Sequence, residues 1–372
     1  MNKVNVYYGP KNEFETILPK RIRKTTLVEL AVKSDARKWE HLLRIEGQQV
    51  DNPAKEEPEK VLCLVAYSDE YAGLSENAIQ SFVSFISQFD IKHIYLQNPP
   101  LYIVEQLKKV KKNIKFYKHR YNTMDLEHIR VLNNGFSSKI IGQDDVRNHL
   151  ITALYPLCRP TFKKPLVLMF YGPTGVGKTE TAKFLSDIFN EKLFRKQFSM
   201  FHSEDFASYI FGGRHSQNSF SKELLERESN IILLDEFDKP NPVFHSAFYQ
   251  LFDDGIFEDK NYSVEVEKAI IICTSNYASE EEVRRKLGDP IFSRFDAVIK
   301  FNQLKVQAVR TIINNEYLKQ LNELCIEEKK LVESSGILDR LLKVSDKLSN
   351  ARQVKKVIRE AISSVIVWEL LK

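Results

Sequence analysis

The stretch that most constrains the fold of this chain is Gly172–Thr179, which reads GPTGVGKT. It matches the phosphate-binding pattern G-x-x-x-x-G-K-[ST] at every fixed position. In such a loop the glycines let backbone N–H groups approach phosphate oxygens, the lysine adds a positive charge, and the final hydroxyl binds Mg²⁺. The predicted cofactor-binding residues are Gly172, Pro173, Thr174, Gly175, Val176, Gly177, Lys178 and Thr179, and Thr179 is also a predicted metal ligand.

The sequence on either side of this loop supports the same interpretation. The apolar run PLVLMFYG precedes the loop, and an amphipathic helical pattern follows it. We therefore expect a strand, the loop and a helix in that order, with the positive end of the helix directed at the phosphates. A glycine turn arising by chance is the alternative, and the flanking pattern argues against it.

A second motif, ILLDEFDK at 232–239, places two acidic residues at the end of an apolar strand. Ligands of open α/β sheets bind at the carboxyl ends of the strands. We expect Asp235 to hold Mg²⁺, directly or through water, and Glu236 to orient and polarise the attacking water. Phosphoryl transfer needs a metal, donors and an aligned water. The two motifs together predict an ATPase that uses ATP and Mg²⁺.

The composition sets limits on the class of protein. At 43% hydrophobic and 28% charged residues, the chain has ample apolar material for a globular core. The net charge of +5 is mild for 372 residues, so a nucleic-acid partner is permitted but not indicated. No apolar run reaches about 18 residues, and no signal peptide is visible, so no membrane span is expected. The four cysteines lack CxxC spacing, which favours reduced thiols in a cytoplasmic protein.

Strands and helices are predicted to alternate in the N-terminal third of the chain. Apolar runs predict strands at 61–67, 91–96 and 114–120, and helical spacing predicts helices at 75–89, 101–112 and 124–132. The polar, proline-containing segment 51–60 is expected to be a loop or linker. The alternation implies a small parallel α/β domain. This region has no GxGxxG, no metal-spaced cluster and no nucleophile motif, so no chemistry is assigned to it.

The turn-rich stretch NNGFSS at 133–138 is expected to separate this domain from the rest. Further strands are predicted at 231–236 and 269–276, and the chain beyond Phe301 is helical and charged. The predicted fold class is α/β, with a parallel sheet between helices, a C-terminal helical lid and a preceding small α/β domain. The predicted divisions are an N-terminal domain of unknown function at 1–133, a nucleotide-binding subdomain at 134–301 and a lid at 302–372.

Taken together, these residues resemble the Clp/Hsp100 branch of the AAA+ ATPases, with the greatest likeness to the second ATPase module of the ClpA and ClpB type. The resemblance covers roughly Ser138 to the C-terminus. It rests on the phosphate loop and on five further stretches, KIIGQDDV (139–146), LLDEFDKPNPVFHSAFYQLFDDG (233–255), CTSN (273–276), FSRFDAVIKF (292–301) and SNARQVKK (349–356).

The resemblance implies roles for five residues outside the two motifs. Ile140 and Ile141 would flank the adenine, and Asn276 would position water against the γ-phosphate. Arg294 would be the arginine finger, and Arg352 would contact phosphate from the lid. Guanidinium groups suit the transition state because they are planar, forked and permanently charged. The alternatives are a strand-end cap for Asn276, a surface ion pair for Arg294 and a solvated helix arginine for Arg352.

The resemblance also implies a homo-oligomer, usually a ring of six, because the finger of one subunit reaches the nucleotide of its neighbour. One family feature is missing: the aromatic G-Y-V-G pore loop does not occur, and the corresponding stretch 207–225 is shorter. We expect Tyr209 and Phe211 to be core residues, with a displaced polypeptide grip as the alternative. Arg214 and His215 are expected at a polar, basic loop tip. Torsin-like relatives also lack the aromatic loop.

Three functions stay open at this stage. The favoured one is an ATPase that remodels a macromolecular client, with protein as the favoured class of client. The second is an ATP-switched assembly module of a multi-protein system, for example a bacterial defence complex, in which the N-terminal domain recruits an effector. The third is a nucleic-acid-stimulated ATPase, which would be recognised by DNA stimulation that falls steeply with salt.

Overall fold

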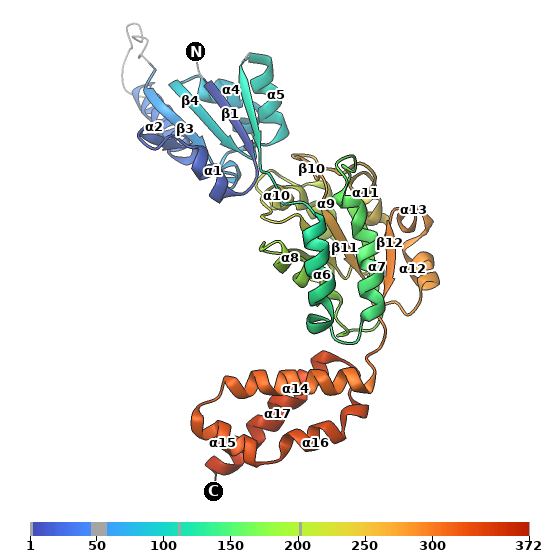
Figure 1. Ribbon diagram of the computed structural model, residues 1–372. Helices are drawn as coiled ribbons and strands as arrows, with labels where there is room; N and C mark the ends of the chain where they lie inside the picture. Colours follow the sequence, from blue (N-terminus) through green and yellow to red (C-terminus); the bar gives the residue numbers. More distant parts are fainter. Residues whose placement is uncertain (1–2, 46–57, 111–112, 201–202, 372) are drawn as a thin grey trace. The chain divides into compact units, whose positions relative to one another are not determined.

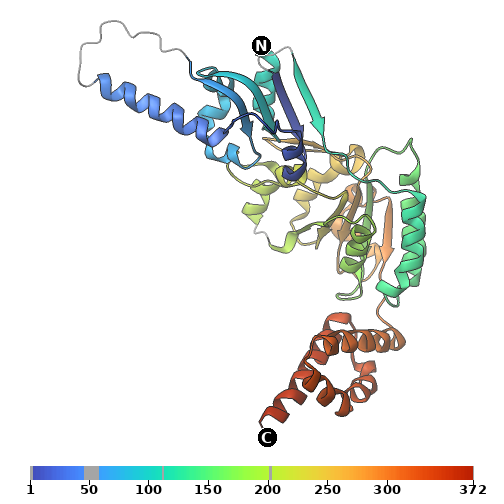
Figure 2. The ribbon, with the colours of Figure 1, turned by 60° about the vertical axis from the view of Figure 1, so that its left-hand side comes forward.

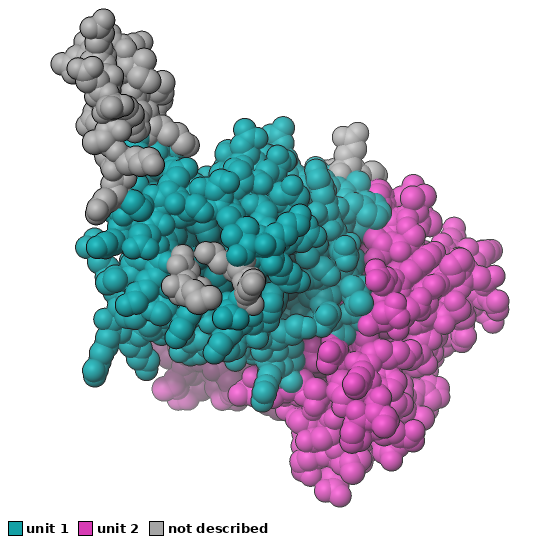
Figure 3. Space-filling view, turned by 90° about the horizontal axis from the view of Figure 1, so that it is seen from above, with its two compact units in different colours: residues 1–121, 201–228, 255–266 teal, residues 122–200, 229–254, 267–372 magenta. Residues whose placement is uncertain are grey.

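The computed structural model describes residues 3–45, 58–110, 113–200 and 203–371. The predicted linker at 51–60 lies outside these residues, except for its last three positions. The chain divides into two compact units, which Figure 3 shows in different colours. Unit 1 comprises residues 1–121, 201–228 and 255–266, and unit 2 comprises residues 122–200, 229–254 and 267–372.

Unit 1 is built around a five-stranded parallel sheet with the strand order β2-β3-β4-β1-β5 (Figure 1). Its strands are β1 (Lys3–Tyr8), β2 (Lys24–Thr26), β3 (Lys60–Ala66), β4 (Asp90–Gln97) and β5 (Ile114–Lys118). Its connecting helices are α1 (Lys11–Ile17), α2 (Leu27–Ile45), α3 (Glu76–Gln80), α4 (Phe82–Ile86) and α5 (Leu101–Val110). The predicted parallel α/β arrangement is confirmed, although the helix predicted at 75–89 is divided at Ser81.

Unit 1 also contains two segments that follow the phosphate loop in the sequence. The first carries α9 (Ser203–Phe211) and α10 (Phe220–Leu225), and the second is a hairpin of β9 (Ile256–Glu258) and β10 (Ser263–Glu265). The domain boundaries predicted from the sequence assign both segments to the nucleotide-binding subdomain, 134–301. In the structure they form one compact unit with residues 1–121.

The loop between α9 and α10 differs in part from the sequence prediction. Tyr209 is buried, as predicted for a core residue. Phe211 is 47% exposed, so its prediction as a core residue is wrong; it ends α9, and Gly212 then turns the chain with a φ of +81°. His215 is buried rather than exposed at a loop tip, because its ring nitrogen is hydrogen-bonded to the Leu74 carbonyl.

Unit 2 is built around a second five-stranded parallel sheet, with the order β12-β6-β11-β8-β7. Its strands are β6 (Leu166–Tyr171), β7 (Phe194–Gln197), β8 (Ile231–Asp235), β11 (Ile270–Thr274) and β12 (Ala297–Lys300). Its helices up to the lid are α6 (Leu126–Lys139), α7 (Asp144–Leu154), α8 (Lys178–Ile188), α11 (Tyr249–Asp254), α12 (Glu280–Leu287) and α13 (Asp289–Phe292). The three central strands are entirely buried, which is typical of a parallel sheet covered on both faces.

One face of this sheet packs against helices α6, α7 and α8 (Figures 1 and 2). Alternate residues of the strands, such as Leu168 on β6 and Ile272 on β11, share a core with Leu150 of α7 and Leu185 of α8. This alternation follows from the period of two in a strand. The packing fixes the carboxyl ends of β6, β8 and β11 at one edge of the sheet, where the predicted functional residues follow.

The predicted break at NNGFSS is wrong, because residues 133–138 lie inside α6. Asparagine, glycine and serine are poor helix formers, but burial of an amphipathic face can override propensity. Leu132 and Phe136 are completely buried on this helix. Gly135 lies against Phe184 of α8, where an added Cβ would come within 2.9 Å of the ring. Close helix packing therefore accounts for the glycine, and the predicted boundary at 133/134 falls within a helix.

The C-terminal region is helical, as predicted. It comprises α14 (Val306–Asn322), α15 (Ile326–Ser334), α16 (Ile337–Lys343) and α17 (Ala351–Leu370). Val309 and Ile313 on α14 and Val354 and Ile358 on α17 are buried together. In the part of the chain that is described, no helix is long and apolar enough to cross a membrane.

Candidate nucleotide site

The phosphate loop joins the carboxyl end of β6 to the start of α8. Gly172 has a φ of +133°, and an added Cβ would lie 2.2 Å from the Phe301 carbonyl oxygen. Gly175 and Gly177 also have positive φ angles, of +73° and +118°. Only glycine adopts such angles without strain, and at Gly172 the close backbone leaves no room for a side chain. The conformation therefore explains why the glycines of the motif occupy these positions.

Lys178 begins α8 and is almost completely buried. Its Nζ donates to the carbonyl oxygens of Gly172 and Pro173, at 2.6 and 2.8 Å, and to Asn276 Oδ1 at 3.1 Å. Burial lowers the pKa of Lys178 to about 8, although the nearby Asp235 carboxylate acts in the opposite direction. The contact with Asn276 shows that the end of β11 and the phosphate loop meet at this point.

The acidic pair at the end of β8 is held by a hydroxyl from the neighbouring strand. Thr274 Oγ1 donates to Asp235 Oδ1 at 2.6 Å and accepts the Glu236 backbone N–H at 2.9 Å. Glu236 has a φ of +56°, a left-handed conformation that is uncommon for a residue with a Cβ. Such backbone strain gathers at functional sites. The Thr274 contacts stabilise the backbone at the end of β8, where Glu236 adopts this conformation.

Two further residues reach the acidic pair from β7 and were not found from the sequence. Arg195 donates from Nε and Nη2 to Asp235 Oδ2, at 3.1 and 2.5 Å. Gln197 donates to Glu236 Oε2 at 3.3 Å. They are two residues apart on a strand, so their side chains lie on the same face. This spacing is the sequence signal by which the two residues could have been found. The four-residue strand lacks a long apolar run, so the sequence analysis did not identify it.

The lid contributes the first residues of α17. Asn350 is the N-cap of this helix and accepts from the Gln353 N–H at 2.9 Å. The next residue, Ala351, donates its N–H to the Gly175 carbonyl at 3.0 Å. These contacts bring the start of α17 to the phosphate loop. Arg352 follows within the first turn and faces the same cavity.

A cavity of about 910 Å³ brings most of the predicted residues together. Its volume is in the range of small-molecule sites. The lining includes the predicted residues Ile140, Ile141, Thr174, Gly175, Val176, Gly177, Lys178, Thr179, Asp235, Glu236, Asn276 and Arg352, together with Arg195, Gln197 and Thr274. Gly172 and Pro173 do not line the cavity and instead receive the hydrogen bonds of Lys178.

Arg294 also lies outside the lining of this cavity. Its Nε donates to Asp253 Oδ2 at 2.9 Å, and its guanidinium lies 4.2 Å from the centre of the Tyr249 ring. Its side chain is a quarter exposed. The structure therefore does not place Arg294 with the other predicted site residues of its own chain.

Gln143, a further residue outside the two sequence motifs, connects the loop to the start of the lid. Its side chain donates to the Asn302 carbonyl at 2.7 Å and to the Val176 carbonyl at 3.3 Å, and accepts the Asn302 N–H at 3.1 Å. The side chain is almost completely buried. It thus links the segment that carries Ile140 and Ile141 with the phosphate loop and the connection to α14.

Comparisons with known proteins find sequence matches over the part of the chain that carries this cavity. Residues 163–325 match the family model described as AAA domain (Cdc48 subfamily). The chain is 31% identical over 216 residues to the ATP-dependent Clp protease ATP-binding subunit ClpL of Staphylococcus aureus strain USA300, covering 51% of this chain and 31% of ClpL. It is 24% identical over 333 residues to the chaperone protein ClpB of Malacoplasma penetrans strain HF-2, covering 80% of this chain and 44% of ClpB. The matches thus span less than half the length of either relative.

Solved structures show the same fold. The Saccharomyces cerevisiae Hsp104–ADP complex matches with a TM-score of 0.53 and 22% identity, covering 66% of this chain and 48% of that one. A closed-state reconstruction of Hsp104 with ATPγS and casein matches with a TM-score of 0.55 and 15% identity, covering 99% and 88%. At these identities the likeness concerns the fold alone. Residues 163–325 thus form an AAA domain of the Cdc48 subfamily, homologous to those of ClpL and ClpB in the Clp/Hsp100 family.

Proposed function

We propose that this chain is an ATPase that binds ATP with Mg²⁺ in the cavity of unit 2 and hydrolyses it. The observation that carries the proposal is the convergence of three strand ends on one cavity. Lys178 follows β6, Asp235 ends β8 with Glu236 directly after it, and Asn276 follows β11. Arg352 comes to the same cavity from the lid. These are the groups that phosphoryl transfer to water requires.

The donor chemistry of the cavity fits a magnesium ion. Thr179 supplies a hydroxyl and Asp235 a carboxylate, both lining the cavity, and hard oxygen ligands of this kind suit Mg²⁺ alongside substrate phosphates. Held by Thr179 and Asp235, a bound Mg²⁺ would supply positive charge that offsets the charge of the phosphates. Lys178 would hold the β- and γ-phosphates, and Ile140 and Ile141 would flank the adenine.

The remaining groups would act on the water and the developing charge. Glu236, which lines the cavity, would orient the attacking water and polarise it. Asn276 would position the same water against the γ-phosphate. Arg352 would stabilise the charge that spreads over the γ-phosphate oxygens, because a guanidinium offers several donors and stays charged.

A homo-oligomer would complete the site. Arg294 does not line the cavity of its own chain, and its side chain is partly exposed beside Asp253 and Tyr249. A guanidinium in that position is available to the nucleotide of a neighbouring subunit, where it would act as a finger. A closed ring, with six subunits as the form suggested by the family resemblance, would give every site such a neighbour.

We further infer a protein as the client, remodelled by the conformational cycle of the oligomer. The support is the homology with ClpL and ClpB, whose names describe an ATP-binding subunit of a protease and a chaperone. The alternative of an ATP-switched assembly module would show ATP turnover without stimulation by unfolded protein. Stimulation by duplex DNA that falls steeply between about 50 and 200 mM salt would favour the nucleic-acid alternative.

Two substitutions in the cavity test the central proposal. Glu236→Gln keeps the size of the side chain and should bind ATP while turnover falls by about 100-fold or more, since it removes the group that polarises water. Lys178→Ala should lose nucleotide binding. ATP turnover with Mg²⁺ and binding of a fluorescent ATP analogue measure both effects, and retention of tight binding by Lys178→Ala would contradict the assignment.

The size of Glu236→Gln with ATP, measured by light scattering, tests the oligomer; a monomer at high protein concentration would rule it out.

A further inference from the structure

Two segments of the ATPase sequence, 203–228 and 255–266, lie against the carboxyl edge of the N-terminal sheet in unit 1. Every contact described below that joins these segments to residues 1–121 is made by a residue that follows β3, ends or follows β5, or begins the helix after β4. This is the edge where open α/β sheets bind their ligands. We propose that these segments are the ligand of the N-terminal domain, and that their docking restrains ATP hydrolysis. The second half of the proposal rests on the proposed ATPase function.

The first contact is made by His215, in the loop between α9 and α10. Its Nε2 is hydrogen-bonded to the Leu74 carbonyl at 2.8 Å, and its Nδ1 lies 2.9 Å from Glu76 Oε1. Leu74 and Glu76 follow β3 in the N-terminal domain. Only 5% of the histidine is exposed, although the Glu76 side chain is about half exposed. A buried imidazole with both nitrogens directed at one domain indicates a specific fit.

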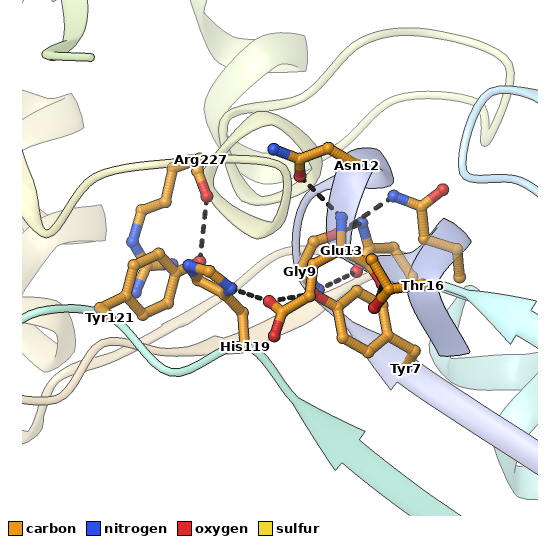
Figure 4. A network of polar contacts seen from close by, with 10 residues as sticks. Tyr7, Gly9, Asn12, Glu13, Thr16, His119, Tyr121 and Arg227 are labelled. Carbon is orange, nitrogen blue, oxygen red and sulfur yellow. Dashed lines mark hydrogen bonds and ion pairs between the residues drawn. The ribbon is translucent and has the colours of Figure 1, made fainter. Parts of the chain in front are cut away.

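The second contact involves Arg227, at the end of the same segment (Figure 4). Its guanidinium lies 4.0 Å from the centre of the Tyr121 ring, and the Tyr121 hydroxyl donates to the Arg227 carbonyl at 3.2 Å. Tyr121 also meets His119 edge-on, and His119 contacts Glu13, which accepts from Tyr7 at 2.8 Å. Arg227 is thus continuous with a chain of polar contacts that reaches β1.

The β9–β10 hairpin makes the third contact. The N–H of Leu101, at the start of α5, donates to the Asn261 carbonyl at 2.8 Å, and Lys118 pairs with Glu265. Asp259 shapes the hairpin turn, because it accepts the N–H groups of Asn261 and Tyr262 at 2.7 and 2.8 Å. It also accepts the Ser221 hydroxyl, and so ties the hairpin to the first segment.

The edge of the sheet between β1 and β4 is filled by the side chains of the domain itself. The Gly9 N–H donates to Asn98 Oδ1 at 2.9 Å, and the Gly9 carbonyl accepts from Asn98 and Gln97, both at 3.0 Å. Connections leave these two neighbouring strands in opposite directions, which is where a small ligand would otherwise bind. The backbone groups of Gly9 are therefore already paired, and the exterior of the edge meets the ATPase segments instead.

The docked segments are continuous in sequence with residues of the nucleotide cavity. Segment 203–228 begins six residues after Gln197, and it leads into β8 and the acidic pair. Segment 255–266 leads into β11, which carries Thr274. Arg195 and Gln197 contact carboxylate oxygens of Asp235 and Glu236, the groups proposed to hold the metal and the water. Docking of the two segments against the N-terminal domain limits the movement of β7, β8 and β11, and so keeps Arg195 and Gln197 in contact with the two carboxylates. Detachment of the segments from that domain should therefore raise ATP turnover.

The test uses the full chain and two independent readouts. His215→Ala should increase amide hydrogen exchange in 203–228 and raise basal ATP turnover by at least about fivefold, the low end of ordinary coupling between sites. Glu76→Gln should shift both readouts in the same direction by a smaller factor, which covers the case in which His215→Ala does not fold. Glu105→Gln, an equal change at an exposed position of α5, should alter neither. Unchanged exchange or unchanged turnover in both docking variants would overturn the proposal.

A charge-reversal cycle tests the hairpin contact. Lys118→Glu and Glu265→Lys each place like charges together and should speed exchange in 255–266, whereas the double variant should return towards the wild-type rate. Failure of the double variant to recover would count against docking. If the wild-type chain neither bound nor hydrolysed ATP, the proposed function would fail, while the exchange measurements, made without nucleotide, would still decide the docking.

Discussion

At the scale of single residues, the candidate site depends on a hydroxyl that serves two partners. Thr274 Oγ1 donates to Asp235 and accepts from the Glu236 backbone, and the residue is 2% exposed. In a buried site, a polar group that loses its partner costs more than the bond itself contributes. The hydroxyl therefore supports both the orientation of the proposed metal ligand and the strained backbone of the proposed catalytic residue.

Thr274→Val keeps the shape of the side chain and removes this hydroxyl. We expect the free energy of unfolding to fall by about 1–3 kcal/mol, since the Glu236 N–H loses its acceptor. ATP turnover should fall by about tenfold, because Asp235 and Glu236 lose their fixed orientation. Urea unfolding and steady-state ATP hydrolysis measure the two effects. Thr274→Ser, which retains the hydroxyl, should preserve both; loss of turnover in this variant would show that the methyl group matters instead.

At the residue scale, the sequence located side chains of the cavity where they belong to a distinctive local pattern. Lys178 and Asp235 follow apolar strands in recognisable motifs, and the structure places both at one cavity. Arg195 and Gln197 were missed because a strand of four residues has no distinctive pattern. His215 was misplaced because its burial depends on Leu74, 141 positions away in the sequence, and no local rule reports such a pairing.

At the scale of elements, the phosphate loop is restricted by backbone packing as well as by its ligand. Gly172 lies against the Phe301 backbone, at the point where β12 gives way to the connection leading to α14. Gly175 lies against Asn350, the N-cap of α17. The loop is therefore held from two sides by the segment that begins the lid and by the lid itself.

Gly172→Ala should be strongly destabilising. The added Cβ would lie 2.2 Å from a backbone oxygen at a φ of +133°, so the loop must move. We expect a loss of roughly 2 kcal/mol or more in unfolding free energy, together with weakened nucleotide binding. Thermal unfolding and titration with a fluorescent ATP analogue provide the measurements. Gly73→Ala is the control, because nothing lies within 4 Å of its added Cβ; equal effects of the two substitutions would contradict the explanation.

Element positions were predictable where apolar periodicity was strong. The strands β3, β4, β6, β8 and β11 lie where apolar runs indicated them. The break predicted at NNGFSS failed because local propensity was outweighed by the packing of Phe136 and of Gly135 against Phe184. Propensity describes an isolated segment, and this helix is stabilised by its neighbours.

At the scale of the whole molecule, the sequence predicted a sheet between helices and a helical lid, and both are present. It did not predict which segments form one compact unit. Residues 203–228 and 255–266 belong to the ATPase sequence but pack with residues 1–121. Such grouping depends on contacts between distant segments, such as Leu101 with Asn261, which leave no periodic signal.

The proposed oligomer makes a prediction at this scale. Arg294→Ala should retain nucleotide binding and lose turnover by about 100-fold or more, as removal of an arginine finger does. Mixing this variant with Glu236→Gln should restore part of the activity, because a subunit with an intact cavity can then receive Arg294 from its neighbour. Arg284→Ala, at an exposed arginine that pairs with Asp289, is the control. Unaltered turnover in Arg294→Ala, or no recovery on mixing, would show that sites are not shared.

The composition of unit 1 from three separate stretches also affects how the protein is made. When residue 121 leaves the ribosome, the edge of the first sheet still lacks His215, Arg227 and the β9–β10 hairpin, which contact it in the folded protein. At ordinary rates of translation, roughly ten seconds pass before residue 266 is synthesised. During that interval Tyr71, fully buried in the finished molecule, belongs to a domain that is not yet complete. The N-terminal unit can therefore complete its fold only after residues 203–228 and 255–266 have been synthesised.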